Sequence, residues 1–363
     1  MKKILLQLTG IFLLTALLLL SCRKDEPGST EKPDEETPTD IYVAGYSNET
    51  TTTGEVVWKN GTPLQVYDPT MLTTGYVRYA NEVADLDLVD NDVYAVWKLS
   101  YKALSAYYPT AKIYAWKNGI NTLVKENDYN IYPRAIDVEG QDIYFAGHYI
   151  DQYELPSVWK NGNREQLPGG IGSVTDLFVN NTDVLAVGYV TSVQSSAAAF
   201  WKNAVLTKLG EGAEFYASSV AKNGNDVFVA GSGKLNGASG PRSALLWKNG
   251  TQQVLAIPSG SIGATAESVA ALGDKVYVAG HAYSQQYNTF ATVWINGIPT
   301  VLSELESEAM SIAVKGKIAY ACGYEKIENR SSAVVWKLQD GKVETIKLSK
   351  GTADAKAYSI KVK

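Results

Sequence analysis

The stretch Asp40-Ile41-Tyr42-Val43-Ala44-Gly45-Tyr46 recurs along the chain, and each copy precedes a segment that resembles Trp58-Lys59-Asn60-Gly61. Six further copies of the first stretch begin at Asp92, Asp142, Asp183, Asp226, Lys275 and Ile318. The paired tryptophans are Trp58, Trp116, Trp159, Trp201, Trp247, Trp294 and Trp336. After a first step of 58 residues, which carries an insertion, these tryptophans lie 42 to 47 residues apart. A period of about 40 to 50 residues is typical of a four-stranded antiparallel unit that stacks on its neighbours.

Turn signals set the order of strands within each unit. Between the third and fourth expected strands stands an Asn-Gly pair, which suits a tight hairpin because both residues tolerate positive φ. These pairs are Asn60-Gly61, Asn118-Gly119, Asn161-Gly162, Asn249-Gly250 and Asn296-Gly297. Equally short turns separate the first and second strands, as at Gly273-Asp274. Each unit is therefore expected to be an antiparallel meander.

The two ends of the repeat region predict a closed ring. The repeats begin in mid-unit at Asp40, and the sequence ends with Tyr358-Ser359-Ile360-Lys361-Val362, which aligns with the first strand of a unit. A linear solenoid would need polar capping units, and the sequence has none. Residues 40–363 thus resemble the seven-bladed β-propeller superfold, without the Trp-Asp, paired-glycine or Asn-Arg signatures of its WD, kelch and NHL families. We expect an all-β, seven-bladed β-propeller, closed by the C-terminal strand joining the N-terminal blade, and the resemblance carries no catalytic residues.

The segment before the repeats has the features of a bacterial lipoprotein leader. Lys2 and Lys3 precede an apolar run, and Leu19-Leu20-Ser21-Cys22 resembles a lipobox. We expect a signal peptide over 1–21, lipidation of Cys22 and a disordered tether over 22–39; a single membrane-spanning anchor is the alternative. The sequence Cys22-Arg23-Lys24-Asp25-Glu26 resembles the export signal of Gram-negative surface lipoproteins. It favours an outer-membrane lipoprotein at the cell surface over an ordinary linker on a periplasmic one.

Composition excludes several classes of partner and cofactor. Loss of the two leader lysines would change the formal net charge from -5 to -7, and no basic stripe suggests nucleic acid. Apart from Cys22 the chain has only Cys322, expected to be a small buried residue, so no disulfide framework is available. The acidic run from Asp85 to Asp92 lacks the spacing of a calcium loop. The strand-opening aspartates, such as Asp226, are too regular for a site and are expected to bond turn amides. We expect no metal and no cofactor.

The long loops of a meander with short turns at one rim gather at the opposite rim, which should carry the variable surface. Tyrosines are frequent in these loops, and the two longest flank the second blade. We expect the main binding zone over blades 1 to 3, with Tyr101, Tyr107 and Tyr108 as ligand contacts; the alternative is that the rings pack loop against loop. The repeated tryptophans should form a packing layer. Trp97, which replaces a repeat glycine, either anchors the adjacent insertion or faces ligand.

A second set of candidates follows the glycine of each repeat, where the second strand should reach the channel mouth. This register holds Tyr46, Lys98, His148, Tyr189, Ser232, His281 and Tyr324. Further candidates at the mouth are Arg134, Tyr149 and Glu267, with Asp85 and Asp176 near the start of first strands. The two histidines belong to blades 3 and 6 and are too far apart to share one proton. We therefore assign no catalytic residue.

Three functions remain open from the sequence. The first is a non-catalytic surface or periplasmic binding protein whose loop-rich face holds a glycan or a protein ligand. The second is a hydrolase or lyase acting on polysaccharide, with an acid and base drawn from Arg134, Glu267, His148 and His281. The third is a scaffold subunit of an outer-membrane complex, which would expose a large apolar patch.

Overall fold

The computed structural model describes residues 39–49, 54–67, 69–71, 75–107, 109–126, 128–193 and 195–363. The expected signal peptide, Cys22 and almost all of the tether lie outside these residues. The part described belongs to one compact unit, Thr39–Lys363. Within it, no helix is long and apolar enough to cross a membrane.

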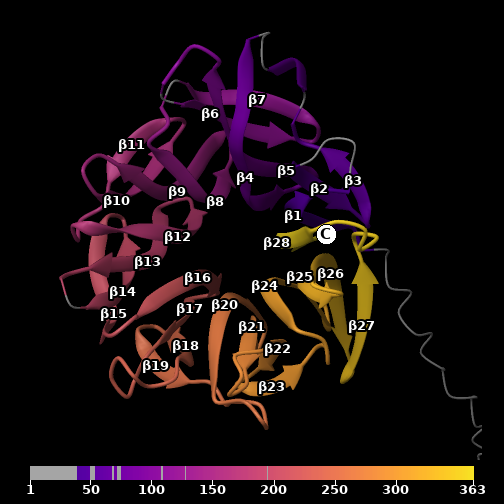
Figure 1. The fold of residues 1–363 in the computed structure, drawn as a ribbon. Coiled ribbons are helices and arrows are strands. Elements are labelled where there is room, and N and C mark those ends of the chain that lie inside the picture. The colour runs from indigo at the N-terminus through magenta and orange to yellow at the C-terminus, as the bar shows by residue number, and fades with distance from the viewer. Residues whose placement is uncertain are drawn as a thin grey trace, which may run out of the picture. The chain divides into compact units, whose positions relative to one another are not determined.

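This unit contains seven four-stranded antiparallel sheets arranged as blades around a centre, which confirms the predicted fold class (Figure 1). From the innermost strand outward, blade 1 is β28 (Ala355–Val362), β1 (Ile41–Ser47), β2 (Gly54–Lys59) and β3 (Thr62–Gln65). A 3-10 turn, η1 (Pro69–Met71), follows β3. Blade 2 is β4 (Tyr76–Val89), β5 (Asp92–Ala103), β6 (Thr110–Lys117) and β7 (Ile120–Glu126). Blade 3 is β8 (Ile131–Glu139), β9 (Asp142–Ile150), β10 (Glu154–Lys160) and β11 (Asn163–Gln166).

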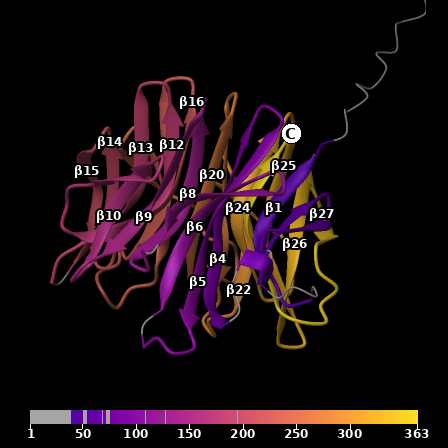
Figure 2. The same cartoon turned by 90° about the horizontal axis from the view of Figure 1, so that it is seen from above.

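The remaining blades repeat this order. Blade 4 is β12 (Ile171–Asn180), β13 (Asp183–Thr191), β14 (Ser196–Lys202) and β15 (Val205–Gly212). Blade 5 is β16 (Tyr216–Asn223), β17 (Asp226–Gly233), β18 (Ser243–Lys248) and β19 (Thr251–Val254). Blade 6 is β20 (Gly263–Leu272), β21 (Lys275–Tyr283), β22 (Thr289–Ile295) and β23 (Ile298–Val301), and blade 7 is β24 (Ser307–Lys315), β25 (Ile318–Ile327), β26 (Arg330–Gln339) and β27 (Lys342–Lys347). Figure 2 views the ring from its edge, with the strands running between its two faces.

Closure occurs as predicted. The C-terminal strand β28 pairs antiparallel with β1, from Ile41 opposite Val362 to Ser47 opposite Ala355. Figure 1 shows the yellow C-terminal strand beside the indigo first strand. Backbone bonds between Asp40 and Lys363, in both directions at 3.1 and 2.9 Å, extend the pairing by one residue. The first blade is thus built from both ends of the repeat region, so no innermost strand lacks a partner.

The repeated Asp and Trp-Lys-Asn-Gly segments meet at the base of each hairpin. In blade 5, Lys248 Nζ lies 2.7 Å from Asp226, whose carboxylate also accepts a 2.7 Å bond from Asn249 Nδ2. The Asn249 Oδ1 atom accepts the backbone N–H of Val227 at 2.9 Å. The aspartate therefore bonds a turn amide, namely the side-chain amide of the turn asparagine. The asparagine binds the backbone, and the aspartate holds the asparagine and lysine side chains.

The tryptophans form the expected packing layer. All seven paired rings are at most 2% exposed, and Cys322 is fully buried on β25. Trp97 is also fully buried: it stacks on Tyr114 at 5.0 Å between ring centroids and donates from Nε1 to Asn121 Oδ1 at 2.7 Å. Asn121 in turn donates to the Val66 carbonyl in the link between blades 1 and 2. Trp97 is thus a buried packing residue, and an anchoring role for the adjacent insertion stays a prediction.

Candidate functional site

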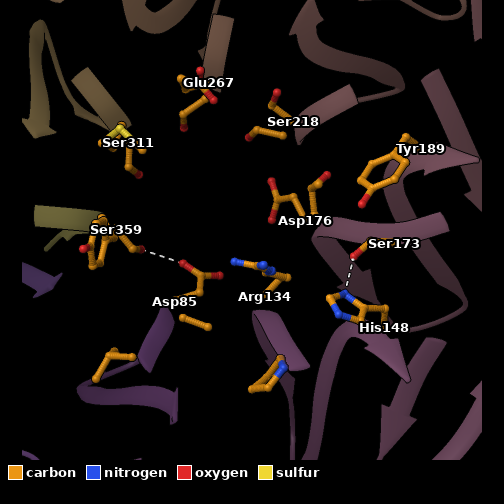
Figure 3. A pocket seen from close by; sticks show the side chains of 18 of the residues that line it. Asp85, Arg134, His148, Ser173, Asp176, Tyr189, Ser218, Glu267, Ser311 and Ser359 are labelled. Carbon is orange, nitrogen blue, oxygen red and sulfur yellow. Dashed lines mark hydrogen bonds between the residues drawn. The ribbon is translucent and has the colours of Figure 1, made fainter. Parts of the chain in front are cut away.

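A cavity of about 620 Å³ lies at the centre of the ring and is lined by residues of all seven innermost strands. Figure 3 shows side chains from several blades pointing into it. The lining also includes His148 and Tyr189 at the ends of second strands and Glu154 at the start of β10. These positions adjoin the long loops, so the cavity belongs to the loop-rich end of the channel.

Each innermost strand carries a bulge at the same height in the ring. There the pairing with the second strand shifts by one residue, and the extra residue has no partner opposite. The seven extra residues are Tyr358, Ala84, Arg134, Thr175, Ser218, Glu267 and Met310. All seven line the cavity. Because a bulge redirects a side chain that would otherwise follow the pleat, this ring of bulges determines which residues meet a ligand.

In six of the seven blades, the residue after the bulge ties its blade to the next one. Its side-chain oxygen accepts a backbone N–H from the neighbouring innermost strand, at 2.8 to 3.3 Å. These bonds run to Asp85 from Ile136, to Asp176 from Val220, to Ser219 from Val269, to Ser268 from Ile312, to Ser311 from Ile360 and to Ser359 from Leu86. Blade 3 has Ala135 at this position, and the Leu177 N–H is bonded by Asp176 of its own strand instead. This belt of bonds fixes the bulges and makes the cavity wall rigid.

On one wall, His148 is buried, with 4% of its surface exposed, and its ring stacks on Tyr132 at 4.9 Å. Its Nδ1 lies 3.0 Å from Ser173 Oγ, and Ser173 donates its own proton to the Val174 carbonyl at 3.1 Å. Its Nε2 lies 4.0 Å from Glu154 Oε1. Burial lowers the pKa of His148, so the ring is neutral at pH 7.

Arg134 and Tyr189 complete this wall. Arg134 is exposed, and its guanidinium forms no hydrogen bond or ion pair with any other residue that the structure describes. The Tyr189 hydroxyl donates to Glu154 Oε2 at 3.2 Å, and burial together with Glu154 raises the pKa of Tyr189 to about 12. The wall therefore offers a ligand one unpaired cation, a histidine ring and a carboxylate.

The opposite wall centres on Glu267. Burial raises the pKa of Glu267 to about 7, and the negative charge of Glu308 acts in the same direction. His281 Nδ1 lies 3.9 Å from Glu267 Oε1 and is buried without a hydrogen-bond partner in the described part of the chain. Its raised pKa lets Glu267 act near neutral pH as a hydrogen-bond donor when protonated and as an acceptor when ionised.

The structure divides the predicted residues into two sets. Arg134, His148, Tyr189 and Glu267 line the central cavity, and His281 lines a groove next to it. The others are not among the residues that line the cavity: Tyr46, Lys98, Tyr149 and Tyr324. Lys98 and Tyr324 are buried on their second strands, with 6% and 5% of their surface exposed. The Lys98 Nζ donates to the Tyr129 carbonyl at 2.7 Å and lies 3.5 Å from the centre of the Tyr132 ring.

The predicted ligand contacts over blades 1 to 3 differ in how far they are exposed. Tyr107 is 85% exposed, whereas Tyr101 is only 8% exposed and packs edge-on against Tyr76 at 5.5 Å. Tyr108 lies outside the described residues. A ligand contact at Tyr107 stays a prediction, and Tyr101 has a packing role in addition to any contact.

The bulged ring is the feature that sequence reasoning missed. Its signal is present in the repeated first strands, where a variable residue precedes a serine or aspartate and then an apolar residue. Examples are Glu267-Ser268-Val269, Met310-Ser311-Ile312 and Tyr358-Ser359-Ile360. Glu154 was also missed, because its position at the start of a third strand has no counterpart that repeats. No group of three or more His, Cys, Asp or Glu in the part described is placed to hold a metal ion.

Neither a protein-family model nor a curated protein sequence matches the chain. Among solved structures, it is similar to an acylaminoacyl peptidase of Pyrococcus horikoshii, with 16% identity and a TM-score of 0.47, over 75% of this chain and 46% of that one. It is also similar to the β-propeller domain of the trilobed protease from Pyrococcus furiosus, with 12% identity and a TM-score of 0.38, over 75% of this chain and 99% of that one. A third similar structure is TolB from Acinetobacter baumannii, with 12% identity and a TM-score of 0.41, over 74% of this chain and 79% of that one. The chain spans less than half the length of the peptidase. Identities and scores this low say nothing about a ligand or a reaction.

Proposed function

We propose that this protein is a non-catalytic binding protein of a Gram-negative envelope that holds a glycan or protein ligand at the loop-rich mouth of its central channel. In this proposal the lipid on Cys22 anchors it in the outer membrane, at the cell surface rather than in the periplasm. The observation that carries the proposal is the rigid ring of bulged residues around a polar cavity, with Arg134 unpaired on one wall and Glu267 on the other.

The chemistry of this cavity supports binding of a polar ligand. Arg134 can donate several hydrogen bonds, while Glu154 accepts them. Hydroxyl and amide groups both donate and accept, so they match walls of this kind. The walls are held by hydrogen bonds from backbone N–H groups to side chains of the neighbouring blade, and a preorganised site loses little entropy when it binds.

The test is an array of glycans and purified envelope proteins probed with the full chain and with two variants. Arg134→Ala removes the unpaired cation, and we expect it to weaken binding of the best ligand at least about tenfold, or about 1.4 kcal/mol. Lys317→Ala, an exposed lysine in the short turn between β24 and β25, is the matched control and should bind as the wild type does. Equal binding by Arg134→Ala and wild type would place the ligand elsewhere.

A second candidate function, a hydrolase or lyase acting on polysaccharide, is favoured by one observation. Glu267 has a pKa of about 7, raised by burial and by Glu308, as a general acid at neutral pH requires. Incubation with polysaccharides and an assay for new reducing ends or new double bonds would test it. Product that is lost in Glu267→Gln would establish an enzyme, and absence of product across the panel leaves the binding function.

A further inference from the structure

A second groove continues the central cavity outward over blades 5 and 6. It has a volume of about 420 Å³ and shares Glu267 with the cavity. Tyr283 and Tyr287 line one part of it, and Arg242 and Glu214 line another. A ligand that occupies the cavity can therefore extend into the groove past Glu267.

The groove carries a flat aromatic surface that is held in place from below. The Tyr287 ring is 76% exposed and nearly parallel to that of Tyr283, at 6.2 Å between centroids and 13° between planes. The Tyr283 hydroxyl accepts a hydrogen bond from the backbone N–H of Arg242 at 2.6 Å. Gly263 leaves the space for that hydroxyl, since a Cβ there would lie 2.2 Å from it. These contacts fix the Tyr283 ring, and the Tyr287 ring packs against it.

The backbone at Tyr287 is strained in a way that presents the ring. Its φ is +63°, in the left-handed region that aromatic residues rarely adopt. Two backbone bonds hold the turn, from Tyr287 N to the Ser284 carbonyl at 2.9 Å and from Ser284 N to the Asn288 carbonyl at 3.0 Å. Strain of this kind persists where the surrounding structure imposes it, and it is frequent at ligand sites.

The cations in the groove are already paired. Arg242 and Lys234 both pair with Glu214, Lys234 at 2.6 Å, and Glu267, whose pKa burial raises to about 7, is partly neutral at pH 7. Neither cation is free to attract a charged ligand. A neutral ligand with hydroxyl groups and one apolar face suits an aromatic ring flanked by hydrogen-bonding groups.

We propose that this groove is a subsite for a neutral oligosaccharide, in which the C–H face of one sugar ring stacks on Tyr287 and a neighbouring sugar reaches Glu267. The end of the glycan then occupies the central cavity. This inference rests on the proposed function, and it selects a glycan rather than a protein as the ligand. A protein ligand fits less well, because a stable protein interface buries about 800 Å² on each side and the groove offers a single exposed ring beside charged groups.

The test is calorimetric titration of the full chain with neutral hexasaccharides of α- and β-linked glucose, mannose, galactose and xylose. For a series that binds, affinity should rise from the monosaccharide to the hexasaccharide. Tyr287→Asn removes the ring while tolerating positive φ, and it should raise the hexasaccharide Kd at least about tenfold, which is about 1.4 kcal/mol, with monosaccharide binding unchanged. Tyr287→Phe keeps the ring and should bind as the wild type does. Tyr153→Ala, at a tyrosine that is 59% exposed on the loop between β9 and β10, should also be neutral.

The outcomes separate this inference from the proposed function. If Arg134→Ala loses the hexasaccharide and Tyr287→Asn does not, the subsite is wrong and the central site stands. If the chain binds an envelope protein and none of the hexasaccharides, the glycan inference is overturned while the binding function holds. If neither variant changes the affinity of any ligand, both are wrong.

Discussion

At the scale of single residues, neighbours on one innermost strand have opposite tasks. Ser218 is a bulged residue that lines the cavity, while Ser219 is 7% exposed and accepts the Val269 N–H from the next blade at 3.2 Å. The two residues have the same chemistry and adjacent positions. They differ in the direction that the bulge gives each side chain.

This pair gives a matched test of the belt of bonds between blades. Ser219→Ala would leave the Val269 N–H buried without its acceptor, and we expect a loss of about 1 to 3 kcal/mol in the free energy of unfolding. Ser218→Ala should stay within about 0.5 kcal/mol of the wild type, because its hydroxyl faces the cavity. Urea unfolding measures both. Equal losses in the two variants would contradict the division of tasks.

A substitution in the tryptophan layer should destabilise the protein more than Ser219→Ala does. Trp247 is fully buried, and its Nε1 donates to the Leu209 carbonyl at 3.1 Å. We expect Trp247→Ala to cost about 3 to 5 kcal/mol in unfolding free energy, because it leaves a cavity between blades. Tyr153→Ala is the exposed control. A Trp247→Ala protein as stable as that control would show that the layer does not hold the blades together.

At the scale of elements, three innermost strands bring carboxylates to one side of the channel. Asp85 and Asp87 lie on β4, Asp137 on β8 and Asp176 on β12, while Lys361 on β28 lies 4.0 Å from Asp87. Burial raises the pKa of Asp85 to about 6. Burial, and to a smaller extent the negative charge of Asp87, raise the pKa of Asp137 to about 7. Ionisation of these carboxyls therefore destabilises the folded protein.

The sign of the pH dependence follows from these shifts. The pKa of Asp137 is higher in the folded protein than its ordinary value of 3.8, so the folded state binds this proton more tightly. Its contribution to stability is therefore present below about pH 4 and is lost as pH rises to about 7. Asp137→Asn removes the charge and keeps an acceptor for the Val179 N–H, now bonded at 2.7 Å. We expect this variant to be about 1 to 3 kcal/mol more stable than the wild type at pH 8 and close to it at pH 4. Thermal melting across this range measures the difference, and parallel curves for the two proteins would contradict it.

How far the sequence predicts each element depends on whether its signal repeats. The strand order, the hairpins and the tryptophan layer could be predicted because Trp-Lys-Asn-Gly and its partner stretch recur in register. Arg134 and Glu267 were found as polar residues near the channel mouth, but the bulge that directs them inward was not. A one-residue shift in pairing depends on contacts between blades and leaves the apolar pattern unchanged. The groove at Tyr287 depends on a single loop and on Gly263, so no period reveals it.

At the scale of the whole molecule, stability depends on closure of the ring. β28 supplies the buried residues Ala357 and Ile360, and Ser359 bonds Asp85 of blade 2 at 2.6 Å. Loss of this strand would expose the inner edge of blade 1 and break the belt of bonds on both of its sides.

Deletion of Ala357–Lys363 tests closure. We expect the truncated chain to lose its cooperative thermal transition, because the first blade would lack its innermost strand. Differential scanning calorimetry shows this directly. A single transition at the wild-type temperature would mean that the ring does not need the C-terminal strand.

We propose that the ring of bulged residues at the loop-rich mouth is the ligand site. A crystal structure of the protein with its best-binding ligand from the arrays would test this proposal. We expect ligand density between Arg134 and Glu267, extended over Tyr287 when that ligand is an oligosaccharide. Density confined to the loops around Tyr107 or to the outer strands, with an empty central cavity, would contradict it.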